Sequence, residues 1–415
     1  MREMKDSGIE WIGEIPKDWN CCKQKYAMKM LNGRAYSEQE FEHNGKYKIL
    51  RVGNLTTNST WYTSSMELPP QKYCKNGDLL YSWSMSYLPI IWRGEKVIYH
   101  YHIWKVITFP CIDKKFTYYY LYSLTDALKS EIHKTTMGFI TMNVMNNSYI
   151  AVPILLEQKK IADFLDGRCT EIDGIVEDIN KEIETLEEYK KSVITEAVIK
   201  GLNPDVEMKE VANIWFNIIP KTWILKKIKY LFTIKKDIAG ESGHTILSIT
   251  QKGIVPKDIS NNEGQIASDY SKYQLVTKGD FAMNHMDLLT GWVDISKYNG
   301  VTSPDYRVFS LNDRNKYNSR YYLYLMQICY TNHIFYSLGR GVSNMGRWRL
   351  QTNNFLNFFV PVPPLQEQQQ IADYLDTKCS EIDSIIELKK EQLETLAEYK
   401  KSLIYEYVTG KKEVI

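Results

Sequence analysis

Residues 157–198 read EQKKIADFLDGRCTEIDGIVEDINKEIETLEEYKKSVITEAV, and residues 367–408 read EQQQIADYLDTKCSEIDSIIELKKEQLETLAEYKKSLIYEYV. The two stretches align without a gap at a constant offset of 210 residues, and they are identical at 24 of 42 positions. A match of this length indicates an internal duplication, so the chain is best considered as two related halves.

Both copies are predicted to be long helices, because apolar residues recur at alternating spacings of four and three and form a narrow stripe. The stripe consists of Ile172, Val176, Ile179, Ile183, Leu186 and Val193 in the first copy, and of Ile382, Ile386, Leu393, Leu396 and Leu403 in the second, where Lys389 interrupts it. Each helix would span about 60 Å. So narrow a stripe suits one partner helix, and the two copies are expected to pair as a coiled coil. Two unrelated surface helices are the alternative.

Composition places the chain among ordinary soluble proteins. Its 415 residues suffice for two domains, and 44% of them are hydrophobic and 25% charged. No apolar run reaches the length of a membrane span, and the first residues lack a signal-peptide core. The seven cysteines include no C-x-x-C pair, which favours a reducing compartment over disulfides or a zinc site. We therefore expect a cytoplasmic protein without membrane contact or a bound metal.

The net charge of +2 conceals an uneven distribution. Residues 20–150 contain 16 basic and 9 acidic residues, and residues 225–360 contain 17 and 10. The two helical stretches are acidic, with 7 basic against 12 acidic residues in 154–200 and 7 against 11 in 361–415. Two basic lobes joined by acidic helices are typical of a protein that touches nucleic acid in two places, although an ordinary charged surface is the alternative.

A second repeat opens each half and sets the domain organisation. The run from Trp11 to Trp19, WIGEIPKDW, matches WFNIIPKTW from Trp215 to Trp223, which we interpret as a packed aromatic turn. The predicted fold is α+β, with two mixed lobes and two long helices in an internal repeat. The predicted ranges are 1–152 for the first lobe, 153–200 for the central helix, 201–360 for a linker with the second lobe, and 361–415 for the last helix.

Within the lobes, two pairs of segments predict corresponding structure. Residues 48–62 and 245–258 are expected to form strand–turn–strand units, and residues 118–124 and 320–326 short helices. A glycine-rich loop at 339–349, GRGVSNMGRWR, combines arginine and asparagine in a way that suits phosphate or base-edge contacts, or simply a solvated surface. The candidate DNA-binding residues are Arg51, Asn54, Arg93, Lys134, Asn284, Arg340, Asn344, Arg347 and Arg349.

Motifs for catalysis are missing from the sequence. It contains no nucleotide phosphate loop, no dinucleotide turn and no H-E-x-x-H zinc motif. The run Ser303-Pro-Asp-Tyr306 is only a loose echo of a methyltransferase motif, and no glycine-rich cofactor loop precedes it. His100 and His102 alternate on a predicted strand, where aromatic packing is favoured over metal binding because no third ligand is evident. No catalytic residue and no metal ligand are assigned.

These features together resemble the specificity subunit of type I restriction–modification enzymes. The resemblance covers almost the whole chain and rests on the duplicated run L-x-EQ-x-x-IA-x-(F/Y)-LD, which starts at Leu155 and at Leu365. It rests also on the E-I-D motif, the E-Y-K-K-S motif and the Trp-x4-Pro-x2-Trp entry, each present twice. One departure is Ile154, which stands where Pro364 of the second copy keeps the family's double proline.

The resemblance implies a non-catalytic subunit with two target-recognition domains, each reading half of a bipartite site in double-stranded DNA. It implies an antiparallel coiled coil that sets the spacing of the half-sites, and this arrangement would also separate two lobes that each precede a helix. The implied partners are two methyltransferase subunits and a motor-nuclease subunit. No cofactor is expected in this chain, because S-adenosylmethionine and ATP would belong to those partners. The alternative is a coiled-coil adaptor whose basic lobes bind protein or RNA.

Overall fold

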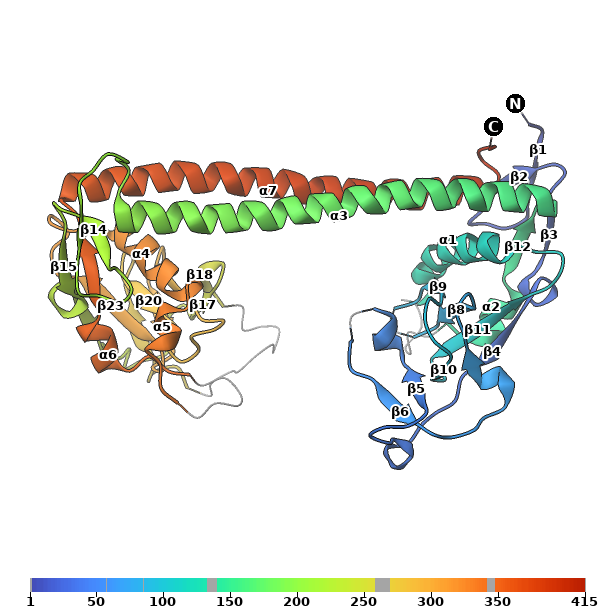
Figure 1. Cartoon of the computed structure of the whole chain (residues 1–415), viewed down its shortest axis with the longest axis horizontal. Coiled ribbons are helices and arrows are strands. Elements are labelled where there is room, and N and C mark those ends of the chain that lie inside the picture. Colours follow the sequence, from blue (N-terminus) through green and yellow to red (C-terminus); the bar gives the residue numbers. More distant parts are fainter. Residues whose placement is uncertain are drawn as a thin grey trace. The chain divides into compact units, whose positions relative to one another are not determined.

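The computed structural model describes residues 2–56, 58–84, 86–132, 140–257, 269–341 and 348–414, the side chains of 129–132 excepted. The chain divides into two compact units: unit 1 comprises Met1–Asn180 with Lys390–Ile415, and unit 2 comprises Lys181–Lys389. Two long helices, α3 (Leu155–Lys200) and α7 (Leu365–Val408), each contribute one end to each unit (Figure 1). Every unit is therefore one lobe packed against the ends of two helices.

Unit 1 contains two four-stranded sheets. The first has the antiparallel order β4-β11-β8-β9, and the second has the order β6-β5-β10-β7, in which β5 and β10 are parallel. Unit 1 also contains the two strand pairs β1-β2 and β3-β12. The bounds are β1 Met4–Asp6, β2 Glu14–Pro16, β3 Asn20–Lys23, β4 Met28–Asn32, β5 Tyr47–Leu50, β6 Tyr62–Ser64, β7 Tyr73–Cys74, β8 Leu79–Ser82, β9 Pro89–Ile91, β10 Val97–Tyr99, β11 Ile103–Thr108, α1 Lys114–Ile132, α2 Met142–Asn147 and β12 Tyr149–Val152.

Unit 2 repeats much of this plan. An antiparallel sheet β16-β23-β20-β21 has the same order of chain segments as β4-β11-β8-β9, and the pairs β13-β14 and β15-β24 repeat β1-β2 and β3-β12. The pairs β17-β18 and β19-β22 stand in the place of the second sheet. The bounds are β13 Met208–Glu210, β14 Ile218–Pro220, β15 Ile224–Lys227, β16 Phe232–Lys235, β17 Leu247–Thr250, β18 Gly253–Pro256, β19 Gln274–Val276, β20 Phe281–Met283, β21 Val293–Ile295, β22 Gly300–Thr302, β23 Arg307–Leu311, α4 Ser319–Thr331, α5 Ile334–Ser337, α6 Thr352–Asn357 and β24 Phe359–Val362.

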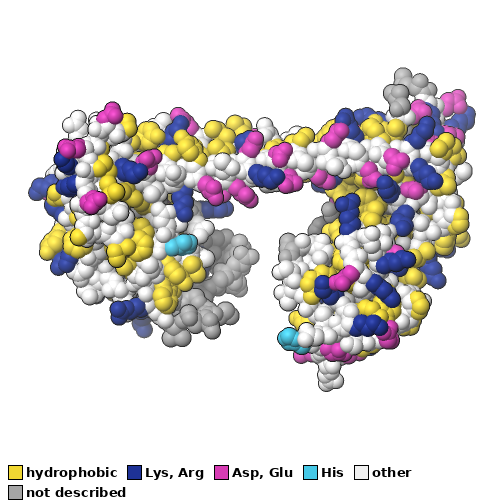
Figure 2. Space-filling view, viewed as in Figure 1, with side chains coloured by type: hydrophobic (Ala, Val, Ile, Leu, Met, Phe, Trp, Pro, Cys, Tyr) yellow, Lys and Arg dark blue, Asp and Glu magenta, His cyan; other side chains and the backbone are white. Residues whose placement is uncertain are grey.

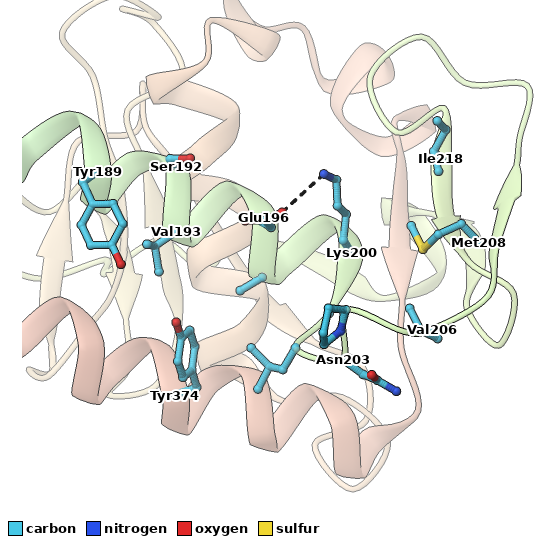
Figure 3. A pocket seen from close by; sticks show the side chains of 14 residues that line it. Tyr189, Ser192, Val193, Glu196, Lys200, Asn203, Val206, Met208, Ile218 and Tyr374 are labelled. Atoms are coloured by element: carbon cyan, nitrogen blue, oxygen red, sulfur yellow. Dashed lines mark hydrogen bonds and ion pairs between the residues drawn. The ribbon is translucent and has the colours of Figure 1, made fainter.

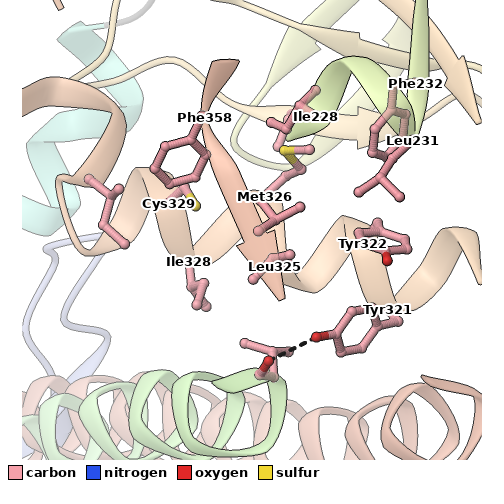
Figure 4. Packing of buried hydrophobic residues seen from close by; sticks show 14 of the residues in the cluster. Ile228, Leu231, Phe232, Tyr321, Tyr322, Leu325, Met326, Ile328, Cys329 and Phe358 are labelled. Carbon is pink, nitrogen blue, oxygen red and sulfur yellow. Dashed lines mark hydrogen bonds between the residues drawn. The ribbon is translucent and has the colours of Figure 1, made fainter. Parts of the chain in front are cut away.

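The core of unit 2 forms where α4 packs between the sheet and the end of α3. Helix α4 buries side chains on both sides: Met326 and Ile328 point in opposite directions from it, and Leu325 and Phe358 belong to the same cluster (Figure 4). The Tyr321 hydroxyl donates to the carbonyl of Val198 at 2.9 Å, so this polar group is satisfied inside an apolar cluster. The helix end and the lobe therefore share a single core.

The two long helices pair in antiparallel fashion, as the contacts within each unit show. In unit 2, Lys190 pairs with Asp383 at 2.6 Å, and Lys389 pairs with Glu182. The later residue of α3 thus meets the earlier residue of α7, which is the pattern of antiparallel helices. In unit 1 the ring of Phe164 contacts that of Tyr407 at 4.5 Å, and Lys400 pairs with Asp173 at 2.6 Å. The antiparallel coiled coil predicted from the sequence is confirmed.

The predicted stripe residues line the seam to different extents. Ile172, Ile179, Ile382, Ile386 and Leu403 are buried, and Val176, Ile183, Leu186, Val193, Leu393 and Leu396 are half-buried. The half-buried ammonium groups of Lys190, Lys389 and Lys400 also lie along the seam and meet carboxylates there. Charged pairs at such positions favour one register over others. Figure 2 shows acidic and basic side chains mixed along the exposed faces of these helices.

The predicted strand–turn–strand units are confirmed as the pairs β5-β6 and β17-β18. The predicted short helices lie within α1 and α4, which are longer, with 19 and 13 residues. No helix within the described ranges is long and apolar enough to cross a membrane.

Candidate nucleic-acid interface

A repeated hydrogen bond fixes each lobe to the start of a helix. The indole N–H of Trp19 donates to Glu157 Oε2 at 3.2 Å, and that of Trp223 donates to Glu367 Oε2 at 2.8 Å. Both tryptophans are buried, so each ring fills the core while its only donor reaches a carboxylate. The entry repeat and the glutamate of the E-Q motif are thus the two halves of one contact.

The glutamine of the same motif closes the junction of lobe and helix. Gln158 Nε2 donates to the carbonyl of Pro153 at 2.8 Å, and its Oε1 accepts from the backbone N–H of Asp113 at 2.7 Å. In unit 2, Gln368 bonds in the same way to Pro363 at 2.8 Å and to Asn318 at 2.8 Å. These buried amides satisfy backbone groups at the start of both α1 and α4.

The aspartate of the L-D motif holds the first helix of each lobe. Asp166 accepts from the Tyr119 hydroxyl at 2.7 Å, and Asp376 accepts from Tyr324 at 2.7 Å. Burial and the neighbouring carboxylate raise the pKa of Tyr119, which keeps this hydroxyl a donor. The duplicated motifs therefore build a framework that carries the lobes and leaves the lobe surfaces free to differ.

The candidate residues of the first lobe separate into surface and structural positions. Arg51 is exposed, with its guanidinium 5.1 Å from the ring of Tyr62, and Arg93 is exposed as well. The Asn54 amide donates to the carbonyls of Asn58 and Thr60 at 3.0 and 2.9 Å, and its oxygen accepts from the Arg51 N–H at 3.1 Å. Asn54 therefore closes the turn that presents Arg51. Lys134 lies outside the described residues.

His100 follows β10 and forms an isolated β-bridge with Arg34, whereas His102 lies in the turn before β11, so the prediction that both alternate on one strand is wrong. Their rings are 4.8 Å apart, and His102 packs edge-on against Trp83 at 5.0 Å. Burial lowers the pKa of His100 to about 4, so its ring is neutral at pH 7. Within the described ranges no group of three metal-ligating side chains occurs. Burial and, to a smaller extent, the charge of the nearby Arg51 lower the pKa of His102.

Two arginines of the second lobe, Arg340 and Arg349, are paired in an isolated antiparallel β-bridge. Arg340 and Arg349 are both exposed and exchange backbone hydrogen bonds of 3.0 and 3.3 Å. Neither forms an ion pair with a carboxylate of the described residues. Asn284 serves the fold, since its side-chain oxygen accepts from Met286 N–H at 3.2 Å and its carbonyl accepts from Tyr330. Asn344 and Arg347 lie outside the described residues.

Sequence reasoning overlooked Arg307, which lies beneath this bridge. Its side chain is 4% exposed, and it donates to the carbonyl of Leu350, the neighbour of Arg349. No motif surrounds it, and a strand arginine is ordinarily placed on the surface. The one available signal is a basic residue at the start of a mainly apolar run, RVFSL at 307–311.

A hollow of about 760 Å³ lies in unit 2 beside the end of α3 (Figure 3). Tyr189 of α3 and Tyr374 of α7 point toward one another along it, and both rings are exposed, by 49% and 41%. Ile218 and Met208 of the β13-β14 pair form its other side. Exposed aromatic and apolar side chains around a hollow are typical of a protein-contact surface.

Comparison with known proteins places this architecture in a family. The model described as Type I restriction modification DNA specificity domain matches twice, at residues 16–185 and 206–397. The Type I restriction enzyme MjaVIII specificity subunit of Methanocaldococcus jannaschii is 25% identical, over 96% of this chain and 94% of that protein. The Type I restriction enzyme EcoBI specificity subunit of Escherichia coli is 19% identical, over 92% and 84%.

A solved structure has the same fold. A chain from work on complex assembly and conformational transition of the type I R-M system superposes with a TM-score of 0.68 at 12% identity, over 96% of this chain and 99% of that one. The chain has two copies of the specificity domain, and each copy includes one of the two paired long helices. This arrangement is that of a two-domain specificity protein. The chain belongs to the type I restriction–modification DNA specificity family, which confirms the predicted resemblance and the predicted role in DNA sequence recognition.

Proposed function

We propose that this chain is the subunit that selects the DNA target of a type I restriction–modification enzyme and that it performs no chemistry by itself. Each lobe reads one half of a bipartite target in double-stranded DNA. The observation that carries this proposal is the duplicated framework: the contacts Trp19–Glu157 and Trp223–Glu367 recur, while the lobe surfaces carry different residues. We call the contacts that attach each lobe to its helix, made by the tryptophan of the entry repeat and by the Glu, Gln and Asp of the helix motif, the mount. Two lobes that share the same mount and differ in surface residues are suited to recognising two different DNA sequences.

We propose the domain bounds expected from the sequence: target-recognition domains at 1–152 and 201–360, and helices at 153–200 and 361–415. Arg51 and Arg93 in the first lobe and Arg340 and Arg349 in the second are exposed cations suited to phosphates or to guanine edges. Lys134, Asn344 and Arg347 remain candidates from the sequence. Asn54 and Asn284 support the turns beside these residues.

The coiled coil has two proposed tasks, to set the spacing of the half-sites and to dock two methyltransferase subunits. The hollow between Tyr189 and Tyr374 supports the second task, because it exposes aromatic surface on the helices themselves. A motor-nuclease subunit would join for cleavage. S-adenosylmethionine and ATP are assigned to these partners, in keeping with the missing cofactor motifs of this sequence.

Sequencing of methylated positions tests the proposal. The chain is expressed with its methyltransferase partner in a host that lacks other methylation, and the modified sites are aligned. We expect a bipartite motif with two specified parts and a fixed unspecified spacer. Gel shifts at rising salt then ask whether duplexes with that motif are preferred, since nonspecific binding falls steeply with salt. No preference among duplexes would support an adaptor that binds protein or RNA instead.

A further inference from the structure

Arg307 is an unusual residue because its charge is buried and no carboxylate of the described residues pairs with it. It begins β23, where its backbone is opposite Met283 of β20, and its side chain is 4% exposed. Burial lowers its pKa to about 10, which still leaves the guanidinium charged at pH 7. Among the described residues no acidic side chain forms an ion pair with it. Such a charge is costly to bury, so stability alone does not account for it.

Its hydrogen bonds and its ring contact are made to neutral groups, and all but one of them lie in one segment; the exception is Met283 Sδ, 3.8 Å from the guanidinium. The guanidinium donates to the carbonyl of Leu350 at 3.0 Å and to Thr352 Oγ1 at 3.4 Å. It also lies over the ring of Phe355 at 4.5 Å, a favourable cation–π distance. The side chain thus fastens residues 350–355 to the central sheet of the lobe.

This segment is continuous with the exposed arginine pair. Leu350 is fully buried and held on both sides, since its N–H donates to the carbonyl of His285 at 2.9 Å while its own carbonyl accepts from Arg307. The preceding residue, Arg349, is joined to Arg340 by two backbone hydrogen bonds. A displacement of Leu350 would therefore move the Arg340–Arg349 bridge.

The first lobe uses the same sheet position differently. Three residues after Asp78, Tyr81 of β8 is paired with Trp104 of β11, and three residues after Asp280, Met283 of β20 is paired with Arg307 of β23. Trp104 is buried and stacks on Tyr81 and on Trp83, with centroids 6.0 and 5.8 Å apart. The framework thus keeps this position in both lobes, while the residue that occupies it changes from an aromatic ring to a cation.

We propose that Arg307 is a positioning residue for DNA recognition by the second lobe, holding Leu350 so that Arg340 and Arg349 meet the DNA in a fixed geometry. The proposal rests on the proposed function of the lobe. DNA phosphate supplies the negative charge that the described residues around Arg307 do not. The side chain remains beneath the bridge and touches no base itself.

The test compares three variants of the full chain, each expressed with its methyltransferase partner. Arg307→Met keeps the bulk and removes the charge and donors, and Arg307→Lys keeps the charge and one set of donors. Val308→Ala is the matched control, because Val308 is buried on the same strand and packs into a different cluster of the lobe. Methylated sites are sequenced, and the melting temperature of each purified chain is measured.

We expect Arg307→Met to weaken discrimination at one or more positions of the second half-site by about tenfold, a loss typical of one displaced arginine contact. The first half-site should not change, and the melting temperature should stay within about 5 °C of the wild type. Arg307→Lys should recover at least about a third of the discrimination. Val308→Ala should lower the melting temperature and leave both half-sites intact.

Two results would overturn the inference. One is full discrimination at the second half-site in Arg307→Met. The other is a loss in both half-sites that follows the melting temperature and is matched by Val308→Ala, since this would make Arg307 merely structural. A wild-type chain that yields no bipartite motif would instead refute the proposed function, so the two failures are distinguishable.

Discussion

The two lobes of this chain agree at their mounts and differ at their surfaces. Trp19 and Trp223 reach equivalent glutamates, and Gln158 and Gln368 close equivalent junctions. The lobes differ at one shared sheet position, where the first has Trp104, stacked on Trp83, and the second has Arg307 beneath two exposed arginines. The difference shows that the framework constrains how a lobe is held and leaves its recognition chemistry free.

Exchange of one whole lobe should have the largest effect. Replacing residues 20–150 by the corresponding segment of a relative with another target should replace one half-site completely, because the mount lies mostly outside this range. The other half-site and the spacer should be retained. Aligned methylated sites provide the measurement, and a change in both half-sites would show that the lobes do not read independently.

Replacing the tryptophan that attaches each lobe to its helix tests whether the two attachments are equally strong. Trp223→Phe leaves a cavity and deprives Glu367 of its donor, so we expect unit 2 to lose about 2–4 kcal/mol of stability. Trp19→Phe should cost unit 1 less, because Glu157 also pairs with Arg2 and keeps a partner. Denaturant unfolding checks both variants. Equal losses would mean that the Arg2 contact contributes nothing.

A single exposed arginine should matter for recognition and not for folding. Arg349→Ala is expected to weaken DNA binding by about 1–3 kcal/mol if the side chain reads a base edge, with relaxed choice at one position. A uniform loss across sequences, with a smaller salt dependence, would identify a phosphate contact instead. Competition gel shifts distinguish the two. Arg314, which donates to the carbonyl of Gly279, offers a control arginine, and its replacement by alanine should leave discrimination unchanged.

The repeat-related ion pairs of the coiled coil should give the smallest effect. A double-mutant cycle with Lys190→Met and Asp383→Asn should yield a coupling of about 0.5–1 kcal/mol, because both groups retain partial contact with water. The cycle with Lys400→Met and Asp173→Asn should yield a similar value in unit 1. Thermal or denaturant unfolding supplies the four free energies of each cycle. A coupling of zero in both would mean that these pairs do not contribute to the register.

The helices and their pairing could be predicted from the sequence, because a gapless repeat with regular apolar spacing carries a long-range signal. The residues of the candidate DNA-binding site were harder to predict from the sequence. His100 and His102 follow a short strand, and alternation over so few residues does not distinguish strand from turn. Asn54 was a candidate for base contact because the sequence does not show that its amide donates to the backbone carbonyls of Asn58 and Thr60. Those two hydrogen bonds depend on how the backbone turns, which the sequence does not reveal. Arg307 was overlooked because its partner, Leu350, is 43 residues away.

The two lobes are proposed to read two half-sites at a distance that the helices set. Four residues inserted after Ile183 add about 6 Å and about 40° beyond a full turn, so the apolar stripe nearly keeps its face. Four more residues after Glu387 would preserve both the Lys190–Asp383 and the Lys389–Glu182 pair. Two residues after Ile183 would turn Leu186 and Val193 by about 200° and should abolish assembly.

Sequencing of the sites methylated by the four-residue variant is the most direct measurement. One base pair advances about 3.4 Å, so the unspecified spacer should grow by one or two base pairs while both half-site sequences stay the same. An active variant that methylates sites with the original spacing would contradict the account, because the helices would then not set the distance between the half-sites.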